Sequence, residues 1–446
     1  MKIMKKLAYL SFCAFAGLLL VFVLIICAFV YFISDKEADI KLNSQVSGKI
    51  VCYFGTWSTY RPSPWTYTID NIPGNLCTHL IYTFVGFNET FQLKYLDNQF
   101  DIVREGFKKF VALRAKWPRL KFIIAVGGWS VGGALFSNMV KDRESRKSFI
   151  TSVATFLTRY KFDGLDLDWQ YPGSTEHQGN YQDKENFAKL IKVRSIRPAN
   201  SANENHFTLL IIPLQELRTE FDKHNYILSS TVPITSSRIQ DGYKITELAR
   251  DLDHFHVLTY NLRGVRSPLV DVHSPLFPRS TDGEEVFGLN VRDGLQYWAS
   301  LGVPKYKLVV GIPFFGKTFT LECEENNGIK APINKTYHTG RPGEFTREAG
   351  ILAYYEICPG LLLNKWTREW DDETKVPYAY YKDQWVGYED EESIRFKMEF
   401  IRKEGYGGAM IWTLDLDDFR GECGENNILL RTIHKHLRVN TLKFFT

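Results

Sequence analysis

The hydrophobic and polar positions from Lys49 onward follow two alternating patterns. Eight runs are rich in β-branched and aromatic residues and are bounded by turn residues, which is typical of strands. These runs are Ile50–Phe54, His79–Val85, Leu120–Val126, Gly164–Trp169, Ile227–Ile234, His254–Tyr260, Lys307–Pro313 and Gly408–Thr413. The stretches between them have the apolar spacing of amphipathic helices, most clearly at Phe100–Trp117, Asp142–Tyr160, Val291–Leu301 and Ser393–Lys403. Eight strands that alternate with helices predict an α/β fold, the (β/α)8 or TIM barrel.

The interval between the seventh and eighth strands is too long for one crossover helix. Residues from about 318 to 390 are rich in Tyr, Trp and Gly and contain short strand-like runs. We expect them to form a small α+β insertion domain between strand seven and the helix that follows it. The whole barrel then extends over residues 49–437, and residues 438–446 form a short tail.

The N-terminus differs from the rest of the chain. Three lysines precede an uncharged run of 27 residues, 7–33, and a membrane-spanning helix needs about 20 residues. We therefore expect residues 1–34 to be a cytoplasmic tip and a transmembrane signal anchor, followed by a stalk at 35–48. The basic end should stay in the cytoplasm, which predicts a single-pass type II membrane protein with an extracellular or lumenal barrel. The alternative is a long signal peptide that is cleaved from a secreted protein.

The cysteines and sequons agree with passage through the secretory pathway. Five of the seven cysteines lie outside the apolar run. That odd number suits two disulfides and one spare thiol in an oxidising compartment. Asn88-Glu89-Thr90 and Asn334-Lys335-Thr336 are N-glycosylation sequons, so we expect glycans at Asn88 and Asn334 where these residues face the lumen.

Composition and charge exclude several classes of function. The net charge of +4 is spread along the chain, which gives no basis for nucleic-acid binding. No Cys or His pair has the spacing of a metal site, so we expect neither a metal nor a cofactor. Aromatic residues make up 15% of the chain, more than packing requires, and such an excess suits a surface that stacks flat sugar rings.

Residues 193–215 interrupt a predicted helix. Phe187 and Ile191 lie on its apolar face, and Leu217 and Phe221 continue the helical period only if the 23 intervening residues are removed. The ends of the segment are also compatible with splice signals, because Val-Arg can be encoded by GTAAGA and Gln by CAG. We interpret the segment as a retained in-frame intron. The alternative is an extra surface loop, whose closure costs little entropy, although unstructured loops of this length are uncommon.

The run from Asp163 to Pro172 carries the strongest chemical signal. Successive side chains of a strand point to opposite faces, so Asp166, Asp168 and Gln170 share one face, opposite two leucines and a tryptophan. We expect these two carboxyl groups and the amide to point into the barrel, toward its C-terminal mouth, where Val, Ile and Leu are usual. Burying such groups is costly unless catalysis or ligand binding needs them. The alternative is a buried hydrogen-bond network that serves the fold alone.

The same run resembles the motif D-G-x-D-x-D-W-E-Y-P of glycoside hydrolase family 18, the chitinases and chitinase-like lectins. The resemblance covers essentially all of residues 49–437 and implies the TIM barrel and chitin or N-acetylglucosamine oligomers as ligands. Further motifs that carry it are Cys52–Phe54 with Trp57, Ala125–Ser130, Leu258–Asn261, Gly311–Gly316, Tyr354–Cys358 and Gly407–Phe419. It also implies disulfides between Cys52 and Cys77 and between Cys358 and Cys423, which leaves Cys323 as the spare thiol.

The resemblance implies a role for each residue of the motif. In the family mechanism, the acetamido oxygen of the bound sugar attacks its own anomeric carbon while the Glu of the motif protonates the leaving oxygen. Asp168 would orient the acetamide, Asp166 would be its partner below, and Asp163 would support the start of the strand. Tyr260 would hydrogen-bond the acetamide, and Trp412 would form the apolar floor under the sugar.

Several positions depart from the family pattern. Gln170 stands at the position of the acid, and a carboxamide cannot donate a proton near neutral pH, although general acid catalysis is typically worth 10²–10⁴-fold. Asn261 replaces an Asp of the family, and Phe315 replaces a Tyr. We therefore expect a catalytically impaired site that still binds sugar. The tryptophans expected to stack on the sugar rings are Trp57, Trp129 and Trp412.

Three functions follow from these residues. The first is a membrane-anchored, inactive chitinase-like lectin that binds N-acetylglucosamine polymers. The second is an active or residually active chitinase that hydrolyses β-1,4 linkages by substrate-assisted catalysis. The third is a growth-factor-like signalling relative that binds no chitin. Such relatives usually lose the Asp that precedes the acid, whereas Asp166 and Asp168 are both present here, so the sequence favours sugar binding.

The interpretation of residues 193–215 predicts a shorter transcript. Amplification of cDNA across this region should give a product that lacks the 69 coding nucleotides, three for each of the 23 residues. The genomic sequence is the size control. A single product that retains those nucleotides would contradict the intron interpretation and favour the loop.

Overall fold

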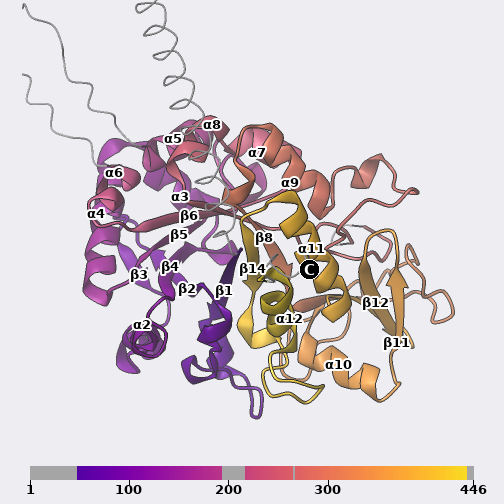
Figure 1. Ribbon diagram of the computed structural model, residues 1–446. Helices are drawn as coiled ribbons and strands as arrows, with labels where there is room; N and C mark the ends of the chain where they lie inside the picture. The colour runs from indigo at the N-terminus through magenta and orange to yellow at the C-terminus, as the bar shows by residue number, and fades with distance from the viewer. Residues whose placement is uncertain (1–47, 193–215, 265–266, 439–446) are drawn as a thin grey trace, which may run out of the picture. The chain divides into compact units, whose positions relative to one another are not determined.

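The computed structural model describes residues 48–192, 216–264 and 267–438. Its main sheet is a closed ring of eight parallel strands, because β1 pairs with β14 on one side and with β2 on the other (Figure 1). The strands of the ring are β1 (Lys49–Gly55), β2 (His79–Phe87), β4 (Lys121–Gly127), β5 (Gly164–Asp168), β6 (Ile227–Val232), β7 (His254–Val257), β8 (Leu308–Pro313) and β14 (Gly408–Trp412). The predicted TIM barrel is therefore confirmed.

Helices follow the strands around the ring and cover its outer surface. They are α2 (Gly106–Ala112), α3 (Gly133–Lys141), α4 (Arg143–Tyr160), α5 (Asp183–Ile191), α6 (Leu217–Asp222), α7 (Ser236–Gly242), α8 (Ile245–Asp251), α9 (Val291–Ser300), α11 (Glu391–Glu404) and α12 (Ile428–Leu437). The side chain of Asp142 caps the start of α4 by accepting from the backbone N–H of Ser145, which satisfies one of the free donors of the first turn.

The prediction of one continuous helix over Phe100–Trp117 is wrong, because the segment is divided into three short elements. A wide turn at Gln99–Val103 precedes α2, a tight turn at Leu113–Ala115 follows it, and Glu105 between the first two adopts a left-handed conformation with φ 59°. The carboxylate of Asp101 accepts a hydrogen bond from the buried Tyr82 hydroxyl of β2. This tertiary contact fixes the first turn against the barrel, and a straight helix would not keep it.

The predicted insertion forms a second, antiparallel sheet with the order β10-β9-β13-β12-β11. Its strands are β9 (Phe315–Thr320), β10 (Ile351–Ala353), β11 (Thr367–Asp371), β12 (Val376–Tyr381) and β13 (Gln384–Gly387), and α10 (Tyr354–Leu362) follows β10. In Figure 1, β11, β12 and α10 lie beside the barrel in orange. The sheet begins directly after β8, so it extends the C-terminal end of a barrel strand.

Two disulfides connect parts of this fold. Cys52 of β1 is bonded to Cys77, just before β2, and Cys358 of α10 is bonded to Cys423, in the segment before α12. The second bond ties the insertion to the last part of the barrel. Both pairs are those that the family resemblance implied, and among the described cysteines Cys323 is the free, exposed thiol.

Some sequence predictions fall on residues outside the described ranges. These are the anchor at 1–34, the stalk up to residue 47, the segment 193–215 and most of the tail. Helices α5 and α6 flank that segment, and their apolar residues Phe187, Ile191, Leu217 and Phe221 are buried. Among the described residues, no helix combines the length and the hydrophobicity that crossing a bilayer requires.

Candidate active site

Strand β5 presents acidic side chains to the inside of the barrel and apolar side chains to the helices. Trp169, just after β5, stacks on Phe136 of α3 with ring centroids 5.1 Å apart and contacts Phe187 of α5 edge-on. Asp166 and Asp168 are fully buried. This follows from the alternation of a strand that pairs on both sides with other barrel strands.

The carboxylate of Asp166 is held by groups from three other strands. It accepts hydrogen bonds from the hydroxyls of Tyr53 (2.7 Å, β1), Ser229 (2.6 Å, β6) and Thr231 (3.2 Å, β6). Nδ1 of His256, on β7, lies 3.0 Å from Oδ1 of the same carboxylate. Burial alone would raise the pKa of Asp166, but His256 and these hydroxyls outweigh it, so the pKa lies below its ordinary value.

Asp168 has the opposite shift. Burial, with the negative charge of Asp166 in addition, raises the pKa of Asp168 to about 7, and a hydrogen bond from Gln170 partly opposes this rise. Nε2 of Gln170 donates that bond to Oδ1 of Asp168 over 2.8 Å. Asp166 is therefore ionised, while Asp168, which lies nearer to the C-terminal end of β5, exchanges its proton near neutral pH.

Gln170 is half-buried at the end of the same face. Its side chain keeps the shape and the hydrogen-bonding capacity of a glutamate, and it gives Asp168 a donor that is present at every pH. It has no acidic proton to pass to a leaving group. Among the polar side chains in this row, Asp168 is the group that can hold a transferable proton near pH 7.

An aromatic cleft opens next to the acidic row. Its cavity has a volume of about 320 Å³, and its walls include Trp57, Tyr260, Asn261, Phe315 and Trp412. Five predicted site residues therefore line one cavity, and they lie at or just after the C-terminal ends of different barrel strands, where TIM-barrel sites lie. Tyr260 and Phe315 pack edge to face, with ring centroids 5.7 Å apart.

Phe84 and Tyr53 support the aromatic walls of the cleft, and neither was predicted as a site residue. Phe84 stacks on Trp57 at 6.2 Å and lies 6.0 Å from Trp412. The ring of Tyr53 lies 5.4 Å from Trp412, while its hydroxyl bonds Asp166. Tyr53 therefore connects the aromatic floor directly to the acidic row.

Asp166, Asp168 and Gln170 form the acidic row and do not line this cavity, and two further predicted site residues lie apart from both. Asp163 is at the opposite end of β5, where it forms an ion pair with Arg114 (2.6 Å) and accepts the backbone N–H of Phe122, so it supports the fold. Trp129 follows β4 and is 56% exposed. The rings of His177 and Trp129 form a T-shaped pair, with centroids 3.9 Å apart.

Within the part of the chain that the structure describes, one cluster has residue types that could ligate a metal. Among the described residues, Cys358, Asp418 and Cys423 bring their ligand atoms within 4.8 Å of one another. The two cysteines are joined in a disulfide, so they offer no thiolate. The carboxylate of Asp418 accepts backbone N–H groups from Gly421 and Cys423, which gives it a structural role.

A row of buried carboxyl groups beside an aromatic cleft, at the mouth of a TIM barrel, is compatible with barrels that bind or cleave sugars. Comparison with known proteins gives the family. The model of the glycosyl hydrolases family 18 matches residues 49–417. An endochitinase of Manduca sexta is 42% identical over 407 residues, which cover 90% of this chain and 69% of that protein. The chain therefore belongs to glycoside hydrolase family 18.

Solved structures agree in fold over most of the chain. The Group IV chitinase of Ostrinia furnacalis, in complex with allosamidin, superposes with a TM-score of 0.80 at 34% identity and covers 88% of this chain and 99% of its own. Human YKL-39, described as a pseudo-chitinase with retained chitooligosaccharide binding properties, has a TM-score of 0.75 at 32% identity and covers 87% and 99%. The family thus contains both enzymes and binding proteins.

The raised pKa of Asp168 predicts a specific dependence of stability on pH. An unfolded Asp titrates near pH 3.9, whereas folded Asp168 titrates at about 7. The folded protein thus binds the extra proton between these values, and wild-type stability falls as the pH rises through this window. The variant Asp168→Asn should therefore be more stable than wild type at pH 8, by about 2–4 kcal/mol, and this gain should disappear toward pH 4.

Denaturant unfolding of both proteins at several pH values measures this difference. The matched control is Asp163→Asn, which breaks an ion pair at the other end of β5 and should destabilise the protein at pH 8. A gain for Asp168→Asn that is the same at pH 4 and pH 8 would show that Asp168 titrates as an ordinary carboxyl group.

Proposed function

We propose that this protein is a membrane-anchored chitinase-like lectin, which binds chitin or N-acetylglucosamine oligomers outside the cell and hydrolyses them poorly. The observation that carries the proposal is Gln170, whose amide donates to Asp168 at the place where the family motif has its acid. The pair of buried aspartates and the tryptophans of the aromatic cleft are retained around Gln170. A site of this composition binds sugar and lacks the group that protonates the leaving oxygen.

The loss of catalysis has more than one source. Replacement of the acid by an amide removes general acid catalysis, which is typically worth 10²–10⁴-fold. Asn261 and Phe315 line the same cleft and replace polar groups that the family motif carries there. Positioned polar groups stabilise the charge that develops in the transition state, so these substitutions lower activity further. Asp168 would still orient the acetamide of a bound sugar.

Binding depends on parts of the cleft that these substitutions leave intact. Trp57 is 43% exposed and rests on Phe84, so one aromatic face is available to a sugar ring. Trp412 is supported from below by Tyr53. YKL-39, whose description combines a pseudo-chitinase with retained chitooligosaccharide binding, has the same fold and 32% identity, which supports a binding role without turnover.

A residually active chitinase is the second candidate, and one observation favours it. Asp168 has a pKa of about 7, so a protonated carboxyl group is available near neutral pH within the acidic row. Hydrolysis by this route would need that proton to reach the leaving oxygen without a glutamate at position 170. We expect such a reaction to be slow, because Asp168 would at the same time have to orient the acetamide.

We also propose that the barrel lies outside the cytoplasm. The uncharged run at 7–33 supports an anchor that leaves the barrel on the lumenal or extracellular side, where chitin polymers would be met. The two disulfides between described residues agree with an oxidising compartment.

Restoring the acid should recover only part of the activity. We expect the full chain, purified in a mild detergent, to bind chitin while it turns over a fluorogenic chitotriose substrate negligibly. Gln170→Glu should raise turnover by about 10²-fold, the lower end of the usual contribution of a general acid. Adding Asn261→Asp and Phe315→Tyr should raise it further and non-additively, because such groups act as a unit.

Gln170→Leu is the matched control, since it removes the amide and adds no acid. Chitin binding should change little across the series, because Trp57 and Trp412 are untouched. Turnover by wild type at the level of the fully restored variant would overturn the inactive assignment. Failure of every variant to bind chitin would instead favour the growth-factor-like function.

A further inference from the structure

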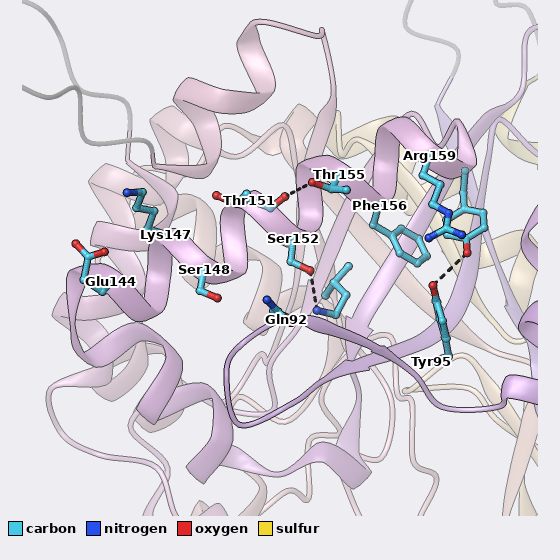
Figure 2. Close-up of a pocket in the computed structure, with 12 residues that line it drawn as sticks. Gln92, Tyr95, Glu144, Lys147, Ser148, Thr151, Ser152, Thr155, Phe156 and Arg159 are labelled. Atoms are coloured by element: carbon cyan, nitrogen blue, oxygen red, sulfur yellow. Dashed lines mark hydrogen bonds between the residues drawn. The ribbon is translucent and has the colours of Figure 1, made fainter.

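A groove on the outside of the barrel lies along α4 and the hairpin of β2 and β3 (Leu93–Tyr95) (Figure 2). Its volume is about 530 Å³, within the range of ligand sites, and it shares no lining residue with the aromatic cleft. The sugar binding proposed above does not involve this groove. Its chemistry therefore needs a separate explanation.

One face of α4 supplies a row of hydroxyl groups to this groove. Ser148, Thr151, Ser152 and Thr155 follow each other at helical spacing and line it together, because residues three and four apart lie on one side of a helix. The far end is aromatic, where the hydroxyls of Tyr95 and Tyr160 meet at 3.2 Å. The charged residues Glu144, Lys147 and Arg159 also line the groove, and the Thr155 hydroxyl donates to the carbonyl of Thr151. This mixture of polar groups and aromatic rings suits a sugar chain, which offers hydroxyls, amides and apolar ring faces.

The Asn88 sequon lies beside the groove, because its Thr90 contacts Ser148, a lining residue. Oδ1 of Asn88 accepts the backbone N–H of Thr90 (3.0 Å), the Thr90 hydroxyl (2.8 Å) and the backbone N–H of Gln92 (2.9 Å). These bonds fix the side chain by its oxygen. Within the described part of the chain, the exposed amide nitrogen of Asn88 makes no hydrogen bond, so it is the atom left to carry a sugar.

The same turn is attached to α4. The hydroxyl of Ser148 donates to the carbonyl of Thr90 over 2.7 Å, and the backbone N–H of Leu93 donates to the hydroxyl of Ser152 over 2.8 Å. The sequon is therefore held at a fixed place beside the groove. From Ser148 to Tyr160 the helix is roughly 18 Å long, at 1.5 Å per residue, which gives the inner sugars of a glycan room to lie along it.

We propose that an N-linked glycan on Asn88 folds back into this groove, with its inner N-acetylglucosamine residues along the hydroxyl face of α4. The proposal uses the expectation that the barrel enters the secretory pathway. Attachment forms a bond from Nδ2 of Asn88 to the anomeric carbon of the first sugar. It breaks the bond between that carbon and the diphosphate of a lipid-linked oligosaccharide donor and releases one amide proton.

The test compares two glycans on one molecule. The full chain is expressed in a eukaryotic secretory host, and mass spectrometry of peptides gives the occupancy of Asn88 and Asn334. The native protein is then treated with an endoglycosidase that cuts between the two innermost sugars. Cleavage at Asn88 should be at least about tenfold slower than at Asn334, which corresponds to 1.4 kcal/mol for leaving the groove. The two rates should be equal after unfolding.

A variant that fills the groove separates docking from other causes of slow cleavage. Thr151 is exposed, so Thr151→Trp should fold, occupy the groove and raise the rate at Asn88 to that at Asn334. Thr151→Ser keeps the hydroxyl and should leave the slow rate unchanged. An unmodified Asn88, equal rates on the native wild type, or no effect of Thr151→Trp would each overturn the proposal. None of these outcomes bears on sugar binding in the aromatic cleft.

Discussion

A carboxylate inside a barrel must be paired and hydrogen bonded, because leaving it isolated in a low-dielectric interior costs many kcal/mol. Asp166 meets this requirement with donors from β1, β6 and β7, among them Tyr53 and Ser229. The network closes across the centre of the ring and connects four strands. Burial, with the charge of the ionised Asp166 in addition, raises the pKa of Asp168 to about 7. The pairing of Asp166 therefore contributes to the proton affinity of the carboxyl group nearest the mouth.

The same constraint explains how a barrel can lose its acid and keep its structure. A glutamine at position 170 occupies the space of a glutamate and donates a hydrogen bond to Asp168, so the acidic row remains satisfied. The aromatic floor formed by Trp57, Phe84 and Trp412 does not include position 170. In the proposed function, binding and proton transfer therefore rest on different side chains, so the second could be lost while the first remains.

The amino-acid pattern predicted the eight barrel strands and the insertion, because strand alternation and helical spacing are local properties. The acidic row at Asp166 and Asp168 was equally accessible, since both lie on one strand. The donors to Asp166 were not predicted, because strand pairing and register decide which side chains meet it. The polar residues within β6 and β7, such as Thr231 and His256, were the available signal. The broken helix near Glu105 depends on a tertiary contact that no local pattern contains.

Titration calorimetry with chitotetraose, followed by chromatography of the recovered ligand, tests the central claim most directly. The full chain should bind the oligosaccharide saturably, and the ligand should be recovered intact after hours with the protein. Trp57→Ala should weaken this binding at least about tenfold, because it removes an aromatic stacking face at the cleft. Absence of binding heat, or recovery of the ligand as shorter products, would contradict the account of a family 18 barrel that binds sugar without cleaving it.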